Sequence, residues 1–149
     1  MRRLSTFGSI VAVSALGLAA AGCGSTGSSP SAASAPAPAA GSIPVSLTEW
    51  SVTPASGTAP AGSVTFAVTN SGTQIHEFVV VKTDTKADAL AVVDNKIDES
   101  VLTPVDEIED IAAGATPTLT VDLAAGHYVL LCNIETHYDQ GMHADFDVQ

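Results

Sequence analysis

The segment from Cys132 to Met142 carries a thiol, an imidazole and a thioether at regular spacing. Cys132, His137 and Met142 follow one another in the pattern C-x4-H-x4-M. Soft sulfur ligands combined with imidazole select copper among the metals that proteins bind. The segment lies between two predicted strands, so that Cys132 ends one strand, His137 lies in the loop and Met142 begins the returning strand. We therefore expect the three side chains to converge on one ion.

A fourth ligand has to come from a neighbouring strand, and His76 is well placed for this role. It stands just before the apolar run from Phe78 to Val81. One Cys, two His and a weak axial Met are the ligands of an electron-transfer copper site. The sequence thus predicts one copper ion, cycling between Cu(I) and Cu(II), on His76, Cys132, His137 and Met142. His143 should face the opposite side of its strand, because side chains alternate along a strand, and it is not expected to bind.

The elements that must position these ligands are predominantly strands. Apolar residues alternate with polar ones along residues 43–52, 64–69 and 119–123, and continuous apolar runs cover 78–81 and 128–132. Such strands, separated by Gly, Pro and Asn, predict an all-β fold, a Greek-key antiparallel β-sandwich over residues 42–149. The run 78–81 is expected to be buried on both faces.

Residues 84–113 interrupt this pattern. The Ala-rich stretch Ala87–Val93 predicts a short helix, and Glu99–Leu102 predicts another helical turn. Acidic residues follow, and Ile108 is expected to start a short strand. We interpret the region as a partly helical insertion beside the sandwich.

Residues 42–149 resemble the cupredoxins, the copper proteins that include plastocyanin, azurin, amicyanin and auracyanin. The segment Gly126–Cys132, GHYVLLC, is similar to the family's G-x-Y-x-x-x-C strand, and the ligand loop has azurin-like spacing. The resemblance implies an eight-stranded sandwich with the copper near one end. It also implies one-electron transfer through the partly exposed edge of His137.

Two positions depart from the pattern of this family. Many relatives have Asn directly after the first His ligand, where this chain has Glu77, and many have Pro-Gly before the second His, where this chain has Glu135 and Thr136. We expect these changes to make the ligand loop less rigid and the site more acidic than usual.

The N-terminal part predicts export. Arg2 and Arg3 precede a short apolar stretch and small residues that end directly before Cys23. Residues 1–22 are thus interpreted as a signal peptide, and Cys23 as a lipidated residue that starts a Pro- and Ser-rich linker over 23–41. An ordinary signal peptide with cleavage nearby is the alternative. The protein is expected at the outer face of the cell membrane or in the periplasm, attached by its lipid anchor.

Cysteine usage agrees with a bound thiol. With Cys23 lipidated, Cys132 has no partner in an oxidising compartment, where thiols are usually paired, buried or bound to a metal. A disulfide between the two cysteines would instead tie the linker to the last strands.

Charge and composition exclude some functions. The formal net charge is −11 with five cationic side chains, so nucleic-acid binding is not expected. An acidic monomer suits redox partners with a basic docking surface. The main hypothesis is an electron carrier, not an enzyme, and the alternative is a module for copper storage or delivery. Without a metal, the same pattern would describe an immunoglobulin-like sandwich with a buried free Cys.

Overall fold

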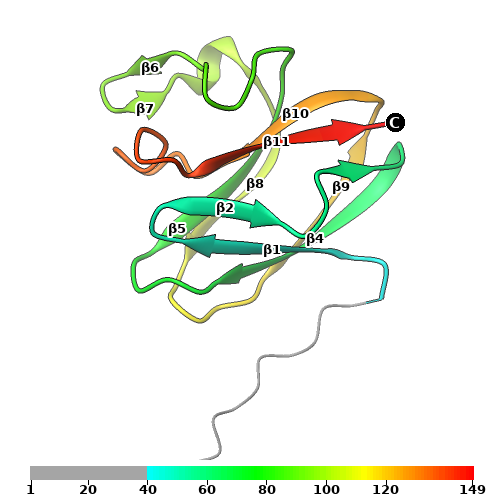
Figure 1. The fold of residues 1–149 in the computed structure, drawn as a ribbon, viewed down its shortest axis with the longest axis horizontal. Helices are drawn as coiled ribbons and strands as arrows, with labels where there is room; N and C mark the ends of the chain where they lie inside the picture. The colour runs from blue at the N-terminus through cyan, green and yellow to red at the C-terminus, as the bar shows by residue number, and fades with distance from the viewer. Residues whose placement is uncertain (1–39) are drawn as a thin grey trace, which may run out of the picture. The chain divides into compact units, whose positions relative to one another are not determined.

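The computed structural model describes residues 40–149, which form two packed β-sheets (Figure 1). One sheet has the order β2-β1-β4-β9 and the other the order β3-β11-β10-β5-β8. The strands of the first sheet are β1 (Ile43–Thr48), β2 (Ser51–Pro54), β4 (Gly62–Asn70) and β9 (Thr118–Leu123). Those of the second are β3 (Thr58–Ala59), β5 (His76–Lys82), β8 (Thr103–Ile111), β10 (Gly126–Leu131) and β11 (His143–Val148). The chain passes repeatedly from one sheet to the other, as in a Greek-key sandwich.

The predicted signal peptide, Cys23 and nearly all of the predicted linker lie outside the described residues. Among residues 40–149, no helix is long and apolar enough to span a membrane.

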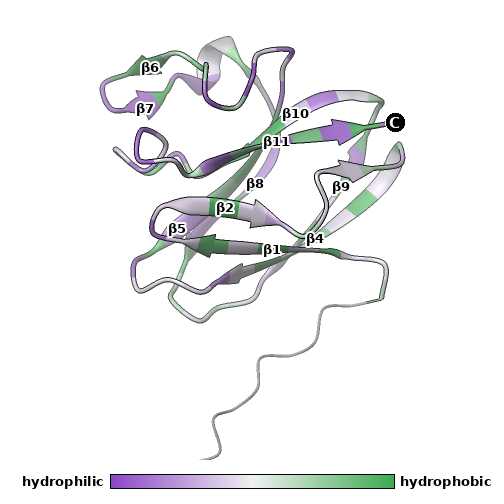
Figure 2. Ribbon diagram, in the orientation of Figure 1, coloured by the Kyte–Doolittle hydropathy of each residue, from purple (hydrophilic) through white to green (hydrophobic). Residues whose placement is uncertain are grey.

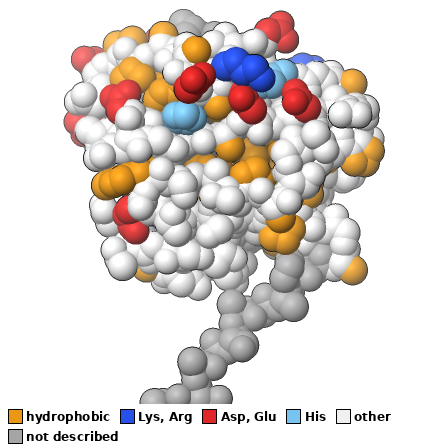
Figure 3. Space-filling view, in the orientation of Figure 1, with side chains coloured by type: hydrophobic (Ala, Val, Ile, Leu, Met, Phe, Trp, Pro, Cys, Tyr) orange, Lys and Arg blue, Asp and Glu red, His pale blue; other side chains and the backbone are white. Residues whose placement is uncertain are grey.

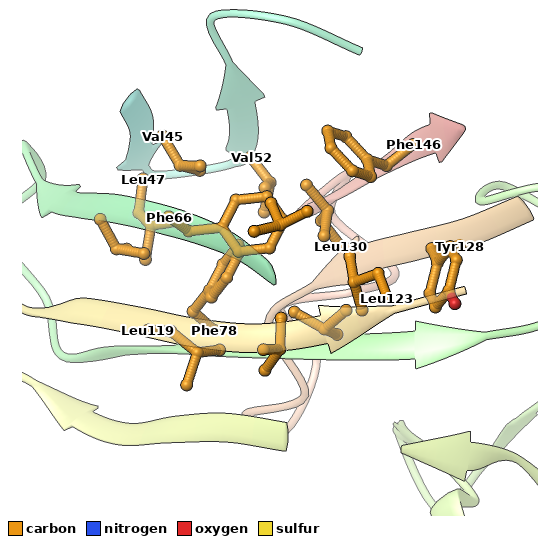
Figure 4. Close-up of a cluster of buried hydrophobic side chains, with 14 of the residues drawn as sticks. Val45, Leu47, Val52, Phe66, Phe78, Leu119, Leu123, Tyr128, Leu130 and Phe146 are labelled. Carbon is orange, nitrogen blue, oxygen red and sulfur yellow. The ribbon is translucent and has the colours of Figure 1, made fainter. Parts of the chain in front are cut away.

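The main core lies between the two sheets, and the alternation of apolar residues explains it. Along β4, Val64, Phe66 and Val68 are buried while the residues between them are more exposed. Phe66 meets Phe78 and Phe146 of the other sheet edge to face, with ring centroids 5.4 and 5.3 Å apart (Figure 4). Figure 2 shows the same alternation as changes of hydropathy along the ribbon. The predicted all-β sandwich is confirmed.

Strand β5 is buried on both faces, as its continuous apolar run predicted. Phe78 and Val80 face the main core, whereas Val79 and Val81 belong to a second cluster on the outer face of the sheet. The other members of this cluster are Ala87, Leu90, Ile97, Val129, Leu131 and Tyr138. The segment between β5 and β8 thus covers a sheet face that would otherwise meet water.

This segment differs from the predicted helical insertion. Residues 87–91 form no helix, and Val92–Val93 (β6) pairs with Lys96–Ile97 (β7) in a hairpin. The N–H of Ala87 donates to Asp145 and that of Leu90 to the hydroxyl of Tyr138. Because a short isolated helix is marginal, such tertiary acceptors outweigh local propensity. The helical turn at Glu99–Val101 does form, as a 3₁₀ turn.

Two further details depart from the prediction. The acidic residues after Pro104 lie within a nine-residue strand, β8 (Thr103–Ile111), at the edge of the second sheet, rather than beside a short strand that starts at Ile108. The sheets are also mixed, because β1 pairs with β4 and β3 pairs with β11 in parallel.

Candidate metal centre

Three of the four predicted ligands meet in the structure. His76 begins β5, Cys132 directly follows β10, and His137 lies in the loop before β11. The two Nδ1 atoms of His76 and His137 are 3.3 Å apart, and Cys132 Sγ lies 3.4 Å from Nδ1 of His137. All three side chains are buried, with 0, 0 and 6% of their surface exposed for His76, Cys132 and His137. Pairing of β5 with β10 brings the first two together, and the loop supplies the third.

Backbone hydrogen bonds close the ligand loop. The N–H of Cys132 donates to the carbonyl of Met142 at 3.0 Å, and the N–H of Met142 donates to the carbonyl of His137 at 3.1 Å. Met142 is fully buried in the main core. The backbone of Met142 is therefore hydrogen-bonded to the backbones of both Cys132 and His137. That the thioether of Met142 binds the metal stays a prediction.

The spacing of the three donors fits a metal ion. A first-row ion such as zinc lies about 2.0–2.1 Å from imidazole nitrogen and about 2.3 Å from thiolate sulfur, so that donors around one ion are roughly 3.3–3.8 Å apart. The observed distances of 3.3 and 3.4 Å between donor atoms agree with this range. Thiolate and imidazole are ligands that copper binds well. The residues present thus fit a copper ion.

Burial shifts the pKa of two of the donors, Cys132 and His137. It raises the pKa of the Cys132 thiol, although the N–H of Glu77, which donates to Sγ at 3.3 Å, acts in the opposite direction. Burial also lowers the pKa of His137, and the neighbouring His76 adds to this effect. A metal that binds the sulfur must therefore displace the thiol proton.

Glu77 braces the ligand loop from the position where many relatives have Asn. Its Oε1 accepts a hydrogen bond from the N–H of Asn133 at 3.1 Å. Asn133 in turn binds both the N–H and the carbonyl of Ile97, at 2.7 and 3.0 Å. Burial raises the pKa of Glu77, and the nearby Glu99 and Glu107 contribute to the shift. Glu77 thus adds a carboxyl group beside the site and connects β5 to the ligand loop.

The turn between β1 and β2 contributes two contacts that the sequence analysis did not find. Glu49 Oε1 lies 3.4 Å from Nε2 of His76, and the Trp50 ring meets the His137 ring edge to face at 5.0 Å. The N–H groups of Gln74 and Thr73 hold the pKa of Glu49 at about 2, below its ordinary value of 4.5. Nothing in the spacing of Glu49 indicates this role, because the contact depends on how the sheets pack.

His143 lies outside the group of donors. Its ring packs against that of Tyr138, tilted by 40° with the centroids 4.7 Å apart, as expected for a side chain on the other side of its strand. A β-sandwich that buries one Cys and two His where β5 begins and β10 ends defines the cupredoxin class of copper proteins.

Comparison with solved structures supports the fold. An auracyanin from the photosynthetic bacterium Roseiflexus castenholzii aligns with a TM-score of 0.56 at 23% identity, over 75% of this chain and 99% of its own. Auracyanin A from Chloroflexus aurantiacus, described as a blue copper protein, aligns with a TM-score of 0.53 at 19% identity, over 72% and 98%. An azurin from Methylomonas sp. strain J gives 0.55 at 16% identity, over 74% and 99%.

Family comparison is more specific. Residues 56–149 match the sulfocyanin (SoxE) domain family, and the chain belongs to that family. No curated protein matches the chain. Family membership and the buried triad together make it a blue copper protein, an electron carrier that holds one copper ion.

Proposed function

We propose that His76, Cys132, His137 and Met142 hold this copper ion, and that the protein passes single electrons between redox partners at the cell envelope. The observation that carries the ligand assignment is the buried triad, whose donor atoms all lie within 4.8 Å of one another. Bound copper supplies the Cu(I)/Cu(II) couple. The backbone bonds that close the loop hold Cys132 and His137 in place, which suits electron transfer because little has to rearrange.

His137 is the proposed point of electron exit. It is the most exposed of the three donors at 6%, and Trp50 and Thr136 lie beside it at the surface. Copper storage or delivery would require the ion to leave, and three buried donors, two of them on a closed loop, oppose that. These features favour a carrier over a delivery module.

Absorption spectra of copper-loaded variants test the ligands. Cys132→Ser replaces a soft thiolate with a hydroxyl, so the intense visible band should disappear even if copper still binds. Met142→Leu should keep the band and raise the reduction potential, because loss of an axial donor destabilises Cu(II) more than Cu(I). His143→Gln is the matched control and should leave both unchanged. A parent protein that takes up no Cu(II), or a coloured Cys132→Ser, would contradict the assignment.

Export and lipidation at Cys23 complete the proposal. Support comes from the apolar stretch and the small residues before Cys23. The parent protein should occur in the membrane fraction, and Cys23→Ala should release or mislocalise it. Mass spectrometry of the mature protein checks the modification directly, and an unmodified Cys23 would contradict the anchor while leaving the copper site intact.

A further inference from the structure

The turn between β1 and β2 places a carboxylate against the buried edge of His76. Glu49 Oε1 is 3.4 Å from Nε2, on the far side of the ring from Nδ1, which faces His137. His76 is fully buried, and Nε2 has no hydrogen-bond partner of good geometry among the described residues. A buried N–H without an acceptor costs free energy, so the Glu49 carboxylate is the group that can satisfy it.

The carboxylate is held in this position by the backbone rather than by His76. The N–H groups of Thr73 and Gln74 both donate to Glu49 Oε1, at 2.7 and 2.8 Å. Gly72 leaves room for it, since a Cβ atom there would lie 2.5 Å from Oε1 and 2.7 Å from Oε2. The position of the carboxylate therefore depends on the turn before β5 and on the absence of a side chain at residue 72.

We propose that Glu49 is a positioning residue for the copper site. Its carboxylate keeps the proton of His76 on Nε2, which leaves the lone pair of Nδ1 free for the metal, and its negative charge favours Cu(II) over Cu(I). A metal-binding imidazole commonly donates its other N–H to a carboxylate, which fixes the tautomer and the ring orientation. The inference rests on the proposed role of His76 as a ligand.

The tautomer of His76 can be measured without metal. Nitrogen-15 NMR of the metal-free parent should show His76 protonated on Nε2. Glu49→Gln should keep this tautomer, because the amide oxygen can still accept. Glu49→Ala should lose it in part. Gly72→Ala should also lose part of the Nε2-protonated form, because the new methyl group displaces the carboxylate while Glu49 itself remains.

The effect of the charge is measured on the copper-loaded protein. Glu49→Gln should raise the reduction potential, because a negative charge beside His76 is removed. Asp122→Asn is the control, since it removes an equal charge from an exposed position on β9. Its potential should stay near that of the parent. Glu49→Ala should also weaken copper binding by about tenfold to a hundredfold, the usual effect of losing such a partner.

The tautomer of His76 and the reduction potential together decide whether Glu49 positions His76. The proposal is overturned if Glu49→Ala and Gly72→Ala keep the parent's tautomer, or if Glu49→Gln and Asp122→Asn have equal potentials. Glu49 would then only organise residues 72–74. If the parent binds no copper, the ligand assignment fails, and the NMR comparison in the metal-free protein still decides whether Glu49 positions His76.

Discussion

Thr136, the residue before His137, has a left-handed backbone conformation with φ of 71°. A β-branched residue is a true outlier in this region, where glycine is at ease. The N–H of Thr136 donates to the carbonyl of Asn95 at 2.8 Å, which helps to hold the conformation. Relatives with Pro-Gly before the second His have glycine at this position. The strain at Thr136 is therefore a cost that this chain carries in its ligand loop.

Replacing Thr136 with glycine should relieve the strain. A non-glycine residue in this region costs about 1–3 kcal/mol, and glycine loses about 0.5–1 kcal/mol through chain entropy, so Thr136→Gly should stabilise the metal-free protein by about 1 kcal/mol. Denaturant unfolding measures the change. Thr118→Gly, at an exposed position of β9, is the control and should destabilise. Equal losses in the two variants would show that Thr136 is not strained.

At the scale of elements, the segment between β5 and β8 and the ligand loop support each other. The hydroxyl of Tyr138 accepts from the N–H of Leu90 at 3.1 Å and donates to the carbonyl of Ala87. Its ring packs in the second cluster, on the outer face of the sheet. Asn133 makes a comparable link to Ile97. A stretch that would be marginal alone is thus ordered by side chains of the loop that carries His137.

Removing the Tyr138 hydroxyl should loosen this contact. Tyr138→Phe keeps the ring but leaves the buried groups of Ala87 and Leu90 without partners, so it should cost about 1–3 kcal/mol of unfolding free energy. Tyr128→Phe is the matched control, because the hydroxyl of Tyr128 makes one bond, to Ala124. Hydrogen exchange should accelerate at Leu90 in the first variant only. Equal exchange in both variants would remove Tyr138 from this role.

At the scale of the whole molecule, negatively charged side chains greatly outnumber positively charged ones. All 16 acidic residues and only three Lys lie within residues 40–149. Figure 3 shows that most acidic side chains on this face gather in its upper part, with few cations among them. Strand β8 adds Asp106, Glu107, Glu109 and Asp110 at the sheet edge, and burial together with neighbouring carboxylates raises the pKa of Glu107. Such a field attracts basic partners over distances set by the Debye length.

Electron exchange with a basic partner should consequently depend on salt. With a small basic haem protein as the probe, the second-order rate should fall about tenfold or more between 0.01 and 0.15 M ionic strength, as the Debye length shortens from about 30 to about 8 Å. Stopped-flow absorbance measures the rate. An acidic probe should show the opposite trend. A rate that does not change with salt for the basic probe would exclude electrostatic steering.

The sequence by itself determined the features that depend on residues close together in the chain. A period of two decides which side of a strand each residue faces, so the core residues of β4 and the two-sided burial of β5 could be predicted. The C-x4-H-x4-M pattern is equally local, and it identified Cys132 and His137, which the structure brings together. His76 could be predicted because it adjoins a buried strand.

Only the tertiary structure decided what depends on groups distant in the chain. Residues 87–91 are not helical because Asp145 and Tyr138 accept hydrogen bonds from their N–H groups, and no local pattern reveals those acceptors. Glu49 reaches His76 because β1 pairs in parallel with β4 and the two sheets pack face to face. Local propensities and spacings are properties of neighbouring residues, whereas these contacts exist only once the sheets have assembled.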